Sequence, residues 1–193
     1  MKVVILAGGM GTRISEYTKI IPKPMIKICG KPILHRIINH YSRYGHNEFY
    51  IALGYKGHII KNYFKKIKFP KNIKINLVDT GKSTMTGGRL KRLKKFLTET
   101  FLLTYGDGLS NINLTKLIRF HKKNKKLITL TAVRPPARFG VIKIKGSYVK
   151  YFREKNLLDS GWINGGFFVI DPKFLELIKE DKTFLEQEPF KKA

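Results

Sequence analysis

Lys2-Val-Val-Ile-Leu-Ala-Gly-Gly-Met-Gly-Thr-Arg13 is the stretch that decides the fold, because a short apolar run ends there in a glycine-rich turn. Such a run predicts a buried strand that carries a loop to the edge of a sheet. Gly8, Gly9 and Gly11 lack a Cβ, so this loop can adopt positive φ and aim several N–H groups at a phosphate. Arg13 adds a planar, permanently charged fork suited to phosphate oxygens. We therefore predict a polyanion site directly after the first strand.

A second basic element follows in Pro22-Lys23-Pro24. The two prolines fix φ on either side of Lys23, which limits the entropy lost when the amine meets an anion. The better-known phosphate motifs do not fit. The dinucleotide fingerprint needs a glycine where Ile14 stands, and the pair Gly30-Lys31 lacks the glycine five residues earlier that a P-loop requires.

Apolar patterning predicts an alternation of strands and helices along the chain. Such alternation is typical of an α/β fold with a mainly parallel sheet covered by helices, whose ligands bind at the carboxyl ends of the strands. In the second half we expect shorter, mixed strands that contribute to binding a second substrate, and no clear domain boundary. The strands are expected at 3–6, 49–53, 73–78, 101–105, 127–133, 140–144, 148–153 and 163–170, and the helices at 33–41, 59–64, 90–97 and 114–124.

Composition points to a globular domain that attracts anions. The 193 residues are 42% hydrophobic and carry a formal net charge of +26. This balance favours nucleic acid, an anionic membrane surface or phosphorylated small molecules as partners, unless most lysines simply form a solvated face. Cys29 is the only cysteine, which excludes a disulfide framework and indicates a reducing compartment. We expect its side chain to be buried as a small hydrophobic group. No segment approaches the roughly 20 apolar residues of a membrane span, so we expect a cytoplasmic protein.

Three further features have two interpretations each. Gly106-Asp107-Gly108 follows an apolar strand, so Asp107 is either a hard oxygen ligand for Mg²⁺ or an ordinary turn residue. Gly87-Gly88 precedes a predicted helix whose N-terminus can accept an anion. The residues after it, Arg89, Lys91 and Arg92, serve a ligand or form a solvated basic face. The five histidines lack metal-ligand spacing and are expected to be structural or exposed.

The combination of GG-x-GTR at 8–13 with PKP at 22–24 resembles the signature of sugar-1-phosphate nucleotidyltransferases. The stretch Val78-Asp-Thr-Gly-Lys-Ser-Thr-Met-Thr-Gly-Gly-Arg-Leu-Lys-Arg92 is similar to that of the glucose-1-phosphate cytidylyltransferases within this family. The resemblance runs from Met1 to about Pro189. It implies a single nucleotidyltransferase domain over 1–193, a three-layer αβα sandwich with a Rossmann-like, glycosyltransferase-A-like sheet.

The resemblance also implies a function, which is cytidylyl transfer from CTP to α-D-glucose 1-phosphate with release of CDP-glucose and pyrophosphate. It further implies Mg²⁺ as cofactor, a homo-oligomer and a supply of CDP-glucose for surface polysaccharide such as the lipopolysaccharide O-antigen. By this match Arg13 and Lys23 are catalytic and Asp107 binds the metal. The nucleotide is bound by Leu6, Ala7, Gly8, Gly9, Gly11, Thr12, Arg13, Thr84, Arg89 and Gly106, and the sugar phosphate by Lys23, Gly140, Glu154, Lys155, Asn164 and Gly165.

Two alternatives remain open from the sequence. A thymidylyl- or uridylyltransferase acting on a hexose 1-phosphate would share the same phosphate motifs. A module of another class, a basic nucleic-acid-binding domain or an inactive nucleotide-binding fragment, would explain the charge and the aromatic residues among the lysines at 63–69. The family's second metal-binding aspartate lies in a motif that nothing before Ala193 matches, and the chain is also shorter than relatives between Phe64 and Val78. We therefore expect CTP binding with poor turnover.

Overall fold

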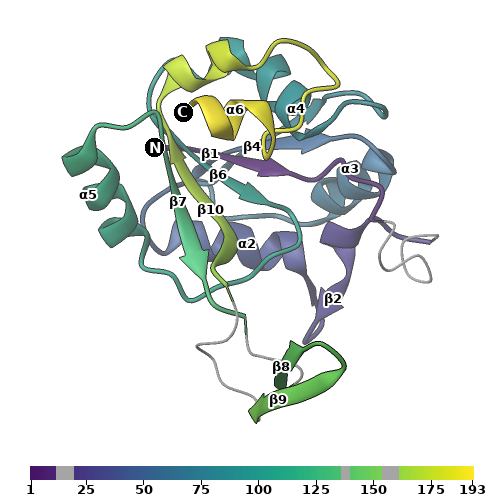
Figure 1. The fold of residues 1–193 in the computed structure, drawn as a ribbon. Helices are drawn as coiled ribbons and strands as arrows, with labels where there is room; N and C mark the ends of the chain where they lie inside the picture. The colour runs from purple at the N-terminus through teal and green to yellow at the C-terminus, as the bar shows by residue number, and fades with distance from the viewer. Residues whose placement is uncertain (12–19, 136–139, 154–160) are drawn as a thin grey trace. The chain divides into compact units, whose positions relative to one another are not determined.

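The computed structural model describes residues 1–11, 20–135, 140–153 and 161–193 (Figure 1). The chain divides into two compact units, one formed by 1–129 with 167–193 and the other by 130–166. That the whole chain acts as one nucleotidyltransferase domain stays a prediction. No helix in the described part of the chain is long and apolar enough to cross a membrane.

A six-stranded sheet in the order β5-β4-β1-β6-β10-β7 forms the framework. The first four strands in that order are mutually parallel, and β10 runs antiparallel to β6. The prediction of a mainly parallel, mixed sheet is therefore confirmed. The strands are β1 (Lys2–Leu6), β4 (Glu48–Leu53), β5 (Lys74–Asp79), β6 (Phe101–Tyr105), β7 (Ile128–Val133) and β10 (Ile163–Ile170).

Helices cover both faces of this sheet, because successive side chains of a strand point to opposite sides. Val3 and Ile5 of β1 belong to one buried cluster, and Val4 and Leu6 belong to the other. The first cluster includes residues of α2 (Ile33–Ser42), α3 (Gly57–Lys66) and α5 (Leu114–Asn124). The second includes residues of α4 (Thr86–Arg92), η3 (Lys94–Phe96), η5 (Pro172–Leu177) and α6 (Glu188–Lys192). The predicted three-layer αβα sandwich is confirmed (Figure 1).

Two short elements lie between β1 and α2. The 3-10 turn η2 (Lys23–Met25) is followed by a hairpin of β2 (Lys27–Ile28) and β3 (Lys31–Pro32). The hairpin turns through Cys29 at φ 46° and Gly30 at φ 78°, the positive values that a two-residue turn between right-twisted strands needs. Cys29 is consequently exposed, and the prediction that it is a buried hydrophobe is wrong.

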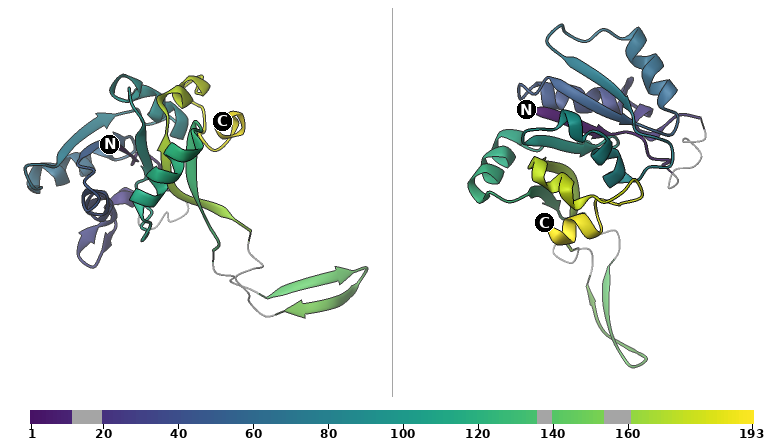
Figure 2. Two further views of the ribbon diagram at one scale, coloured as in Figure 1. Left: turned by 90° about the vertical axis from the view of Figure 1, so that its left-hand side faces the viewer. Right: turned by 90° about the horizontal axis from the view of Figure 1, so that it is seen from above.

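The second unit consists of a hairpin and the strand segments that lead into it. Strands β8 (Val141–Lys145) and β9 (Tyr148–Arg153) pair antiparallel, as the sequence predicts, and form the two-stranded ribbon seen in Figure 2. Strand β7 differs from its prediction as a core strand, because Leu130 and Val133 are 40% and 43% exposed. It is the last strand in the sheet order, so only one of its sides has a neighbouring strand.

Candidate active site

The glycine turn lies at the carboxyl end of β1, the central strand to which β4 and β6 are parallel. This is the sheet edge at which ligands bind in such folds. Among Gly8, Gly9 and Gly11, only Gly11 takes a positive φ, of 67°. Leu6 and Ala7 are buried, whereas Gly9 is exposed. Thr12 and Arg13, which the sequence predicts to bind phosphate, lie outside the described residues.

Gly8 is required for a reason other than positive φ. The guanidinium group of Arg89 lies where a Cβ on Gly8 would stand, and it lies equally close to Gly54 after β4. Arg89 is only 3% exposed. Of the two interpretations of Arg89, that of a solvated basic face is therefore wrong, although Lys91 and Arg92 are exposed.

The Arg89 guanidinium joins the ends of three parallel strands. Its Nη1 donates to the carbonyl oxygens of Leu53 (3.0 Å) and Gly81 (2.7 Å) and to Thr80 Oγ1 (2.8 Å), and its Nη2 donates to the Gly8 carbonyl (2.9 Å). Burial lowers the pKa of Arg89, as does the charge of Arg92, while Asp79 raises it. An arginine nevertheless stays protonated in proteins, so a full positive charge is shared among carbonyl and hydroxyl oxygens below the glycine turn.

This arrangement fixes the direction of one amide of the turn. Carbonyl and N–H point in opposite directions across a trans peptide bond. The Gly8 carbonyl points at Arg89 and also accepts a hydrogen bond from the Tyr55 amide (3.1 Å). The Gly9 N–H consequently points away from Arg89, on the exposed side of the turn. It is oriented to donate to an anion bound there.

The start of α4 is occupied by a later part of the chain. The amides of Gly87 and Gly88 donate to the Thr183 carbonyl, and the Met85 amide donates to the Asp181 carbonyl. Carbonyl oxygens of Asp181 and Thr183 lie closer than 3 Å to where Cβ atoms on Gly88 and Gly87 would stand. The prediction that Gly87-Gly88 forms an anion-accepting helix N-terminus is therefore wrong. The glycines allow backbone to pack on backbone instead.

Thr84 lies within this packed region. It is buried, and a Cβ on Gly81, which has φ 86°, would lie 2.7 Å from Thr84 Oγ1. Glu186 links the start of α4 to the end of β6, because its carboxylate accepts hydrogen bonds from Thr86 Oγ1 (2.8 Å) and from the Tyr105 hydroxyl (2.5 Å). The segment 79–92 that carries the sequence resemblance is thus held by residues 181–186.

Lys23 and Asp107 meet in an ion pair, with 2.5 Å between Nζ and Oδ2 and with side chains 28% and 33% exposed. Pro24 packs on Gly106, where a Cβ would lie 2.9 Å from both Pro24 Cγ and the Leu6 carbonyl oxygen. The Gly106 amide also donates to the Leu6 carbonyl (2.9 Å). The fold therefore brings the predicted catalytic lysine and the predicted metal ligand together at the carboxyl ends of β1 and β6.

Asp107 fits a divalent cation that a nucleotide helps to hold. No group of three or more histidine, cysteine, aspartate or glutamate side chains that suits a metal occurs among the described residues. Mg²⁺ in phosphoryl-transfer sites takes one or two carboxylates and completes its shell with phosphate oxygens and water. A single part-exposed carboxylate at this sheet edge meets that requirement.

Apart from Lys23, the predicted sugar-phosphate residues belong to the second unit, and the structure describes three of these five. Asn164 Oδ1 accepts a hydrogen bond from the Gly166 amide (2.8 Å), and a Cβ on Gly165 would lie 2.7 Å from Thr131 Oγ1. Gly140 immediately precedes β8. Glu154 and Lys155 lie outside the described residues.

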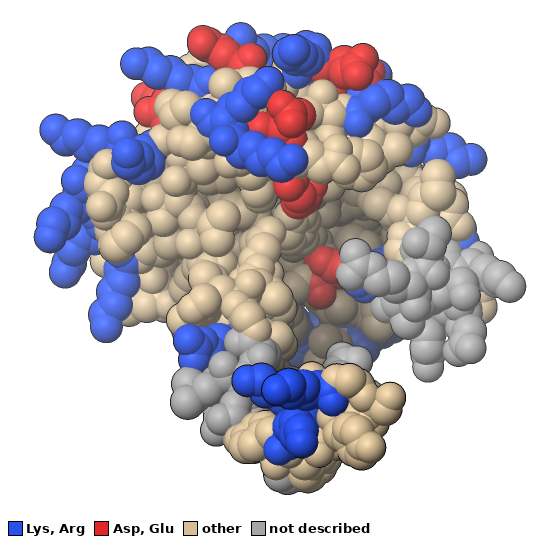
Figure 3. Space-filling model, in the orientation of Figure 1, with Lys and Arg blue, Asp and Glu red and all other residues tan. Residues whose placement is uncertain are grey.

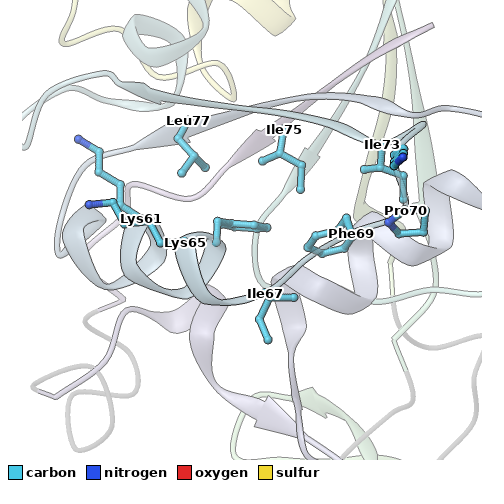
Figure 4. Close-up of a pocket in the computed structure, with 10 residues that line it drawn as sticks. Lys61, Lys65, Ile67, Phe69, Pro70, Ile73, Ile75 and Leu77 are labelled. Carbon is cyan, nitrogen blue, oxygen red and sulfur yellow. The ribbon is translucent and has the colours of Figure 1, made fainter.

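A groove of about 550 Å³ lies elsewhere, between α3 and β5 (Figure 4). Phe64, Ile75 and Leu77 give it apolar walls, and Lys61 and Lys65 stand on its helical side. None of the predicted site residues lines it. The groove is therefore separate from the chemistry that the sequence predicts.

Sequence reasoning missed the residues that support the nucleotide motif. Gly54, Thr80 and Gly81 contact Arg89, and residues 181–186 hold 83–88. The first three were accessible to prediction, since they follow strands parallel to β1 and must meet at its carboxyl end. The contact with 181–186 joins residues almost 100 positions apart, and no local pattern signals it.

Together, the parallel sheet, the glycine turn and the lysine-aspartate pair at one sheet edge define an α/β enzyme that handles phosphate groups. The Nucleotidyl transferase family model matches residues 2–192. The chain belongs to this family and is a nucleotidyltransferase, so the predicted resemblance is confirmed.

Two relatives and one solved structure specify the similarity. The chain is 46% identical to the glucose-1-phosphate cytidylyltransferases of Salmonella typhimurium and of Salmonella typhi, in each case over 98% of this chain and 82% of the relative. The crystal structure of HddC from Yersinia pseudotuberculosis complexed with GMP-PN superposes with a TM-score of 0.76 at 28% identity. That alignment covers 100% of this chain and 86% of the other.

Proposed function

We propose that this chain transfers a cytidylyl group from CTP to α-D-glucose 1-phosphate, giving CDP-glucose and pyrophosphate. The observation that carries the proposal is the set of hydrogen bonds made by Arg89. Through them the segment 78–92, which is similar to that of the glucose-1-phosphate cytidylyltransferases, supports the phosphate turn of β1. The relatives with that name are 46% identical over 98% of the chain. A thymidylyl- or uridylyltransferase is the second candidate.

The reaction requires positioning and charge neutralisation more than a protein nucleophile, because a phosphate oxygen of the sugar attacks the α-phosphorus of the nucleotide. In our proposal the glycine turn and Arg13 hold the β- and γ-phosphates that leave as pyrophosphate. Lys23 neutralises the α-phosphate and the incoming sugar phosphate. A Mg²⁺ ion held by Asp107 supplies further charge neutralisation on the triphosphate when bound.

The proposal also assigns nucleoside and sugar contacts. Thr84, Arg89, Gly106 and the backbone of 6–8 face the nucleoside, and Arg89 acts at least in part by holding the Gly8 carbonyl. Gly140, Glu154, Lys155, Asn164 and Gly165 bind the sugar phosphate. A cytoplasmic location, a homo-oligomer and a role in supplying CDP-glucose for surface polysaccharide complete the proposal.

Pyrophosphate release measured with each of the four NTPs and glucose 1-phosphate tests the nucleotide. We expect clear preference for CTP, and equal use of UTP or dTTP would replace the proposal by its second candidate. Asp107→Asn should weaken the dependence of the rate on Mg²⁺, with Glu99→Gln, an exposed carboxylate before β6, as the control. An unchanged metal requirement in Asp107→Asn would leave Asp107 a turn residue.

The nucleic-acid-binding alternative has less support. Lys and Arg dominate the charged surface of the face in Figure 3, in agreement with the net charge of +26. However, the aromatic residues of 63–69 pack against the core instead of standing free for bases, with Tyr63 against Phe64 and Phe64 against Phe69. RNA or DNA binding that persists with little loss at about 200 mM salt would revive this alternative.

A further inference from the structure

We propose that Lys23 is the resident counter-ion of Asp107, and that a divalent cation arriving with the nucleotide triphosphate replaces it. The free protein then binds divalent cations weakly, and metal and nucleotide bind in a coupled way. The inference rests on the proposed function in one respect, that the triphosphate binds at the carboxyl end of β1. It concerns which cation contacts Asp107 before and after the triphosphate binds, and does not concern the base or the sugar.

The contact between Lys23 and Asp107 is built by backbone packing. Lys23 begins the turn η2, whose next residue Pro24 lies against Gly106, and Asp107 follows Gly106 directly. The Gly106 amide is in turn bonded to the Leu6 carbonyl of β1 (2.9 Å). The two Cα positions are therefore fixed relative to each other, so the 2.5 Å pair loses less side-chain entropy than a pair between mobile loops.

One carboxylate cannot satisfy both cations equally well. The ammonium group of Lys23 is a compact positive charge that contacts Oδ2 of Asp107. A divalent cation on the same carboxylate would stand a few ångströms from that ammonium, and the repulsion between them weakens metal binding to the free protein. The overall charge of +26 acts in the same direction, but Lys23 contributes only one unit of it, as does Lys27.

A triphosphate changes this balance in two ways. Its oxygens offer Lys23 a charge-assisted partner with more negative charge than one carboxylate. They also complete the coordination shell of a hard cation, for which Asp107 alone supplies too few ligands. Each ligand consequently raises the affinity for the other, and by linkage the factor is the same in both directions.

Mn²⁺ binding to the nucleotide-free full chain, followed by the EPR signal of free Mn²⁺, tests the proposal without any turnover. Lys23→Gln should bind Mn²⁺ about tenfold more tightly than the original chain, within the usual range of coupling between sites. Lys23→Arg keeps the charge and should keep the weak affinity. The matched control is Lys27→Gln, which removes an equally positive, exposed side chain four residues away and should leave the affinity unchanged.

The double variant Lys23→Gln/Asp107→Asn shows whether the Mn²⁺ affinity gained in Lys23→Gln comes from Asp107. It should lack this gain. Equal Mn²⁺ affinity of Lys23→Gln and the original chain, or an equal gain in Lys27→Gln, would overturn the proposal. Thermal melts of each variant verify that the fold is retained, and Lys23→Met, which also removes the charge, preserves the test if Lys23→Gln is unstable. Because no base or sugar is present, this result and the NTP assay can fail independently.

Discussion

The two halves of the candidate site are held in opposite ways. Around Arg89, a buried guanidinium is enclosed by carbonyl and hydroxyl oxygens from the ends of β1, β4 and β5. Around Lys23 and Asp107, two side chains about one third exposed meet in a single ion pair. The first half is a fixed support, since moving the buried Arg89 would break several charge-assisted hydrogen bonds at once. The second half can exchange its partners with a ligand, since water and phosphate can replace the pair at low cost.

Arg89→Met gives the largest expected effect and breaks the fixed half. It removes four hydrogen bonds from the guanidinium, to the carbonyls of Gly8, Leu53 and Gly81 and to Thr80 Oγ1, and a hydrogen bond from a charged group contributes about 1.5–3 kcal/mol. We expect the free energy of unfolding to fall by about 4 kcal/mol, measured by urea denaturation. Arg92→Met is the control, because Arg92 lies one turn along α4 but is exposed. Equal losses in both variants would contradict the distinction.

Lys23→Ala tests the exchangeable half, where activity should change and stability should not. The ammonium contact with the reacting phosphates strengthens as charge develops, and removing such a contact lowers turnover by about 10². The rate of pyrophosphate release from CTP with glucose 1-phosphate measures this, beside the melting temperature. Lys27→Ala, on the exposed strand β2, should retain turnover. A similar rate loss in both would mean that Lys23 contributes only general charge.

Gly88→Ala tests how far the fixed half depends on the C-terminal segment. In a helix, Ala is favoured over Gly by about 1 kcal/mol, so propensity alone predicts stabilisation. A Cβ at this position would meet the Asp181 backbone closer than 3 Å, and backbone cannot move aside cheaply. We expect a net loss of about 2 kcal/mol in the free energy of unfolding. Gly108→Ala, with open space around it, is the control, and stabilisation by Gly88→Ala would contradict the packing argument.

Most of the framework was predictable because each strand and helix has a local pattern. The predicted strand Phe101–Tyr105 and helix Leu114–Asn124 have the observed bounds. The rule that ligands bind at the carboxyl ends of parallel strands is enough to bring Gly8 and Asp107 to one edge of the sheet. What fails is the inference of environment from residue type. Arg89 is a charged residue in a basic run, yet it is buried, because the ends of three strands supply its acceptors.

The errors have the same origin. Gly87-Gly88 has the local form of an anion site, but its amides are used by Thr183, which lies far along the sequence. Cys29 is exposed because it lies in the turn of the hairpin between β2 and β3, where Ile28 and Gly30 are exposed too, a position that its apolar side chain does not reveal. In both cases a distant or backbone requirement overrides side-chain preference. The predictions for Arg13, Glu154 and Lys155 concern positions outside the described residues and stay predictions.

Mild acid gives the smallest expected effect. It should lower the free energy of unfolding through a histidine that belongs to neither half of the site. Burial, together with the nearby positive N-terminus, lowers the pKa of His46 from 6.5 to about 4. The unfolded chain therefore binds this proton more readily than the folded chain, so stability is complete above pH 6.5 and is lost as pH falls toward 4. Because His46 is half-buried and partly screened, we expect a loss of about 1 kcal/mol between pH 7 and pH 5. His46 lies just before β4, at the sheet edge opposite the site, so this loss should leave the Lys23–Asp107 pair intact.

Urea denaturation at both pH values measures the change in the free energy of unfolding. His46→Gln should flatten the dependence of this free energy on pH, whereas His58→Gln, an exposed control, should not. If the free energy of unfolding of His46→Gln depends on pH as steeply as that of the original chain, His46 is not the source of the acid sensitivity. The source would then be His35, His40 and His121, whose pKa values burial also lowers.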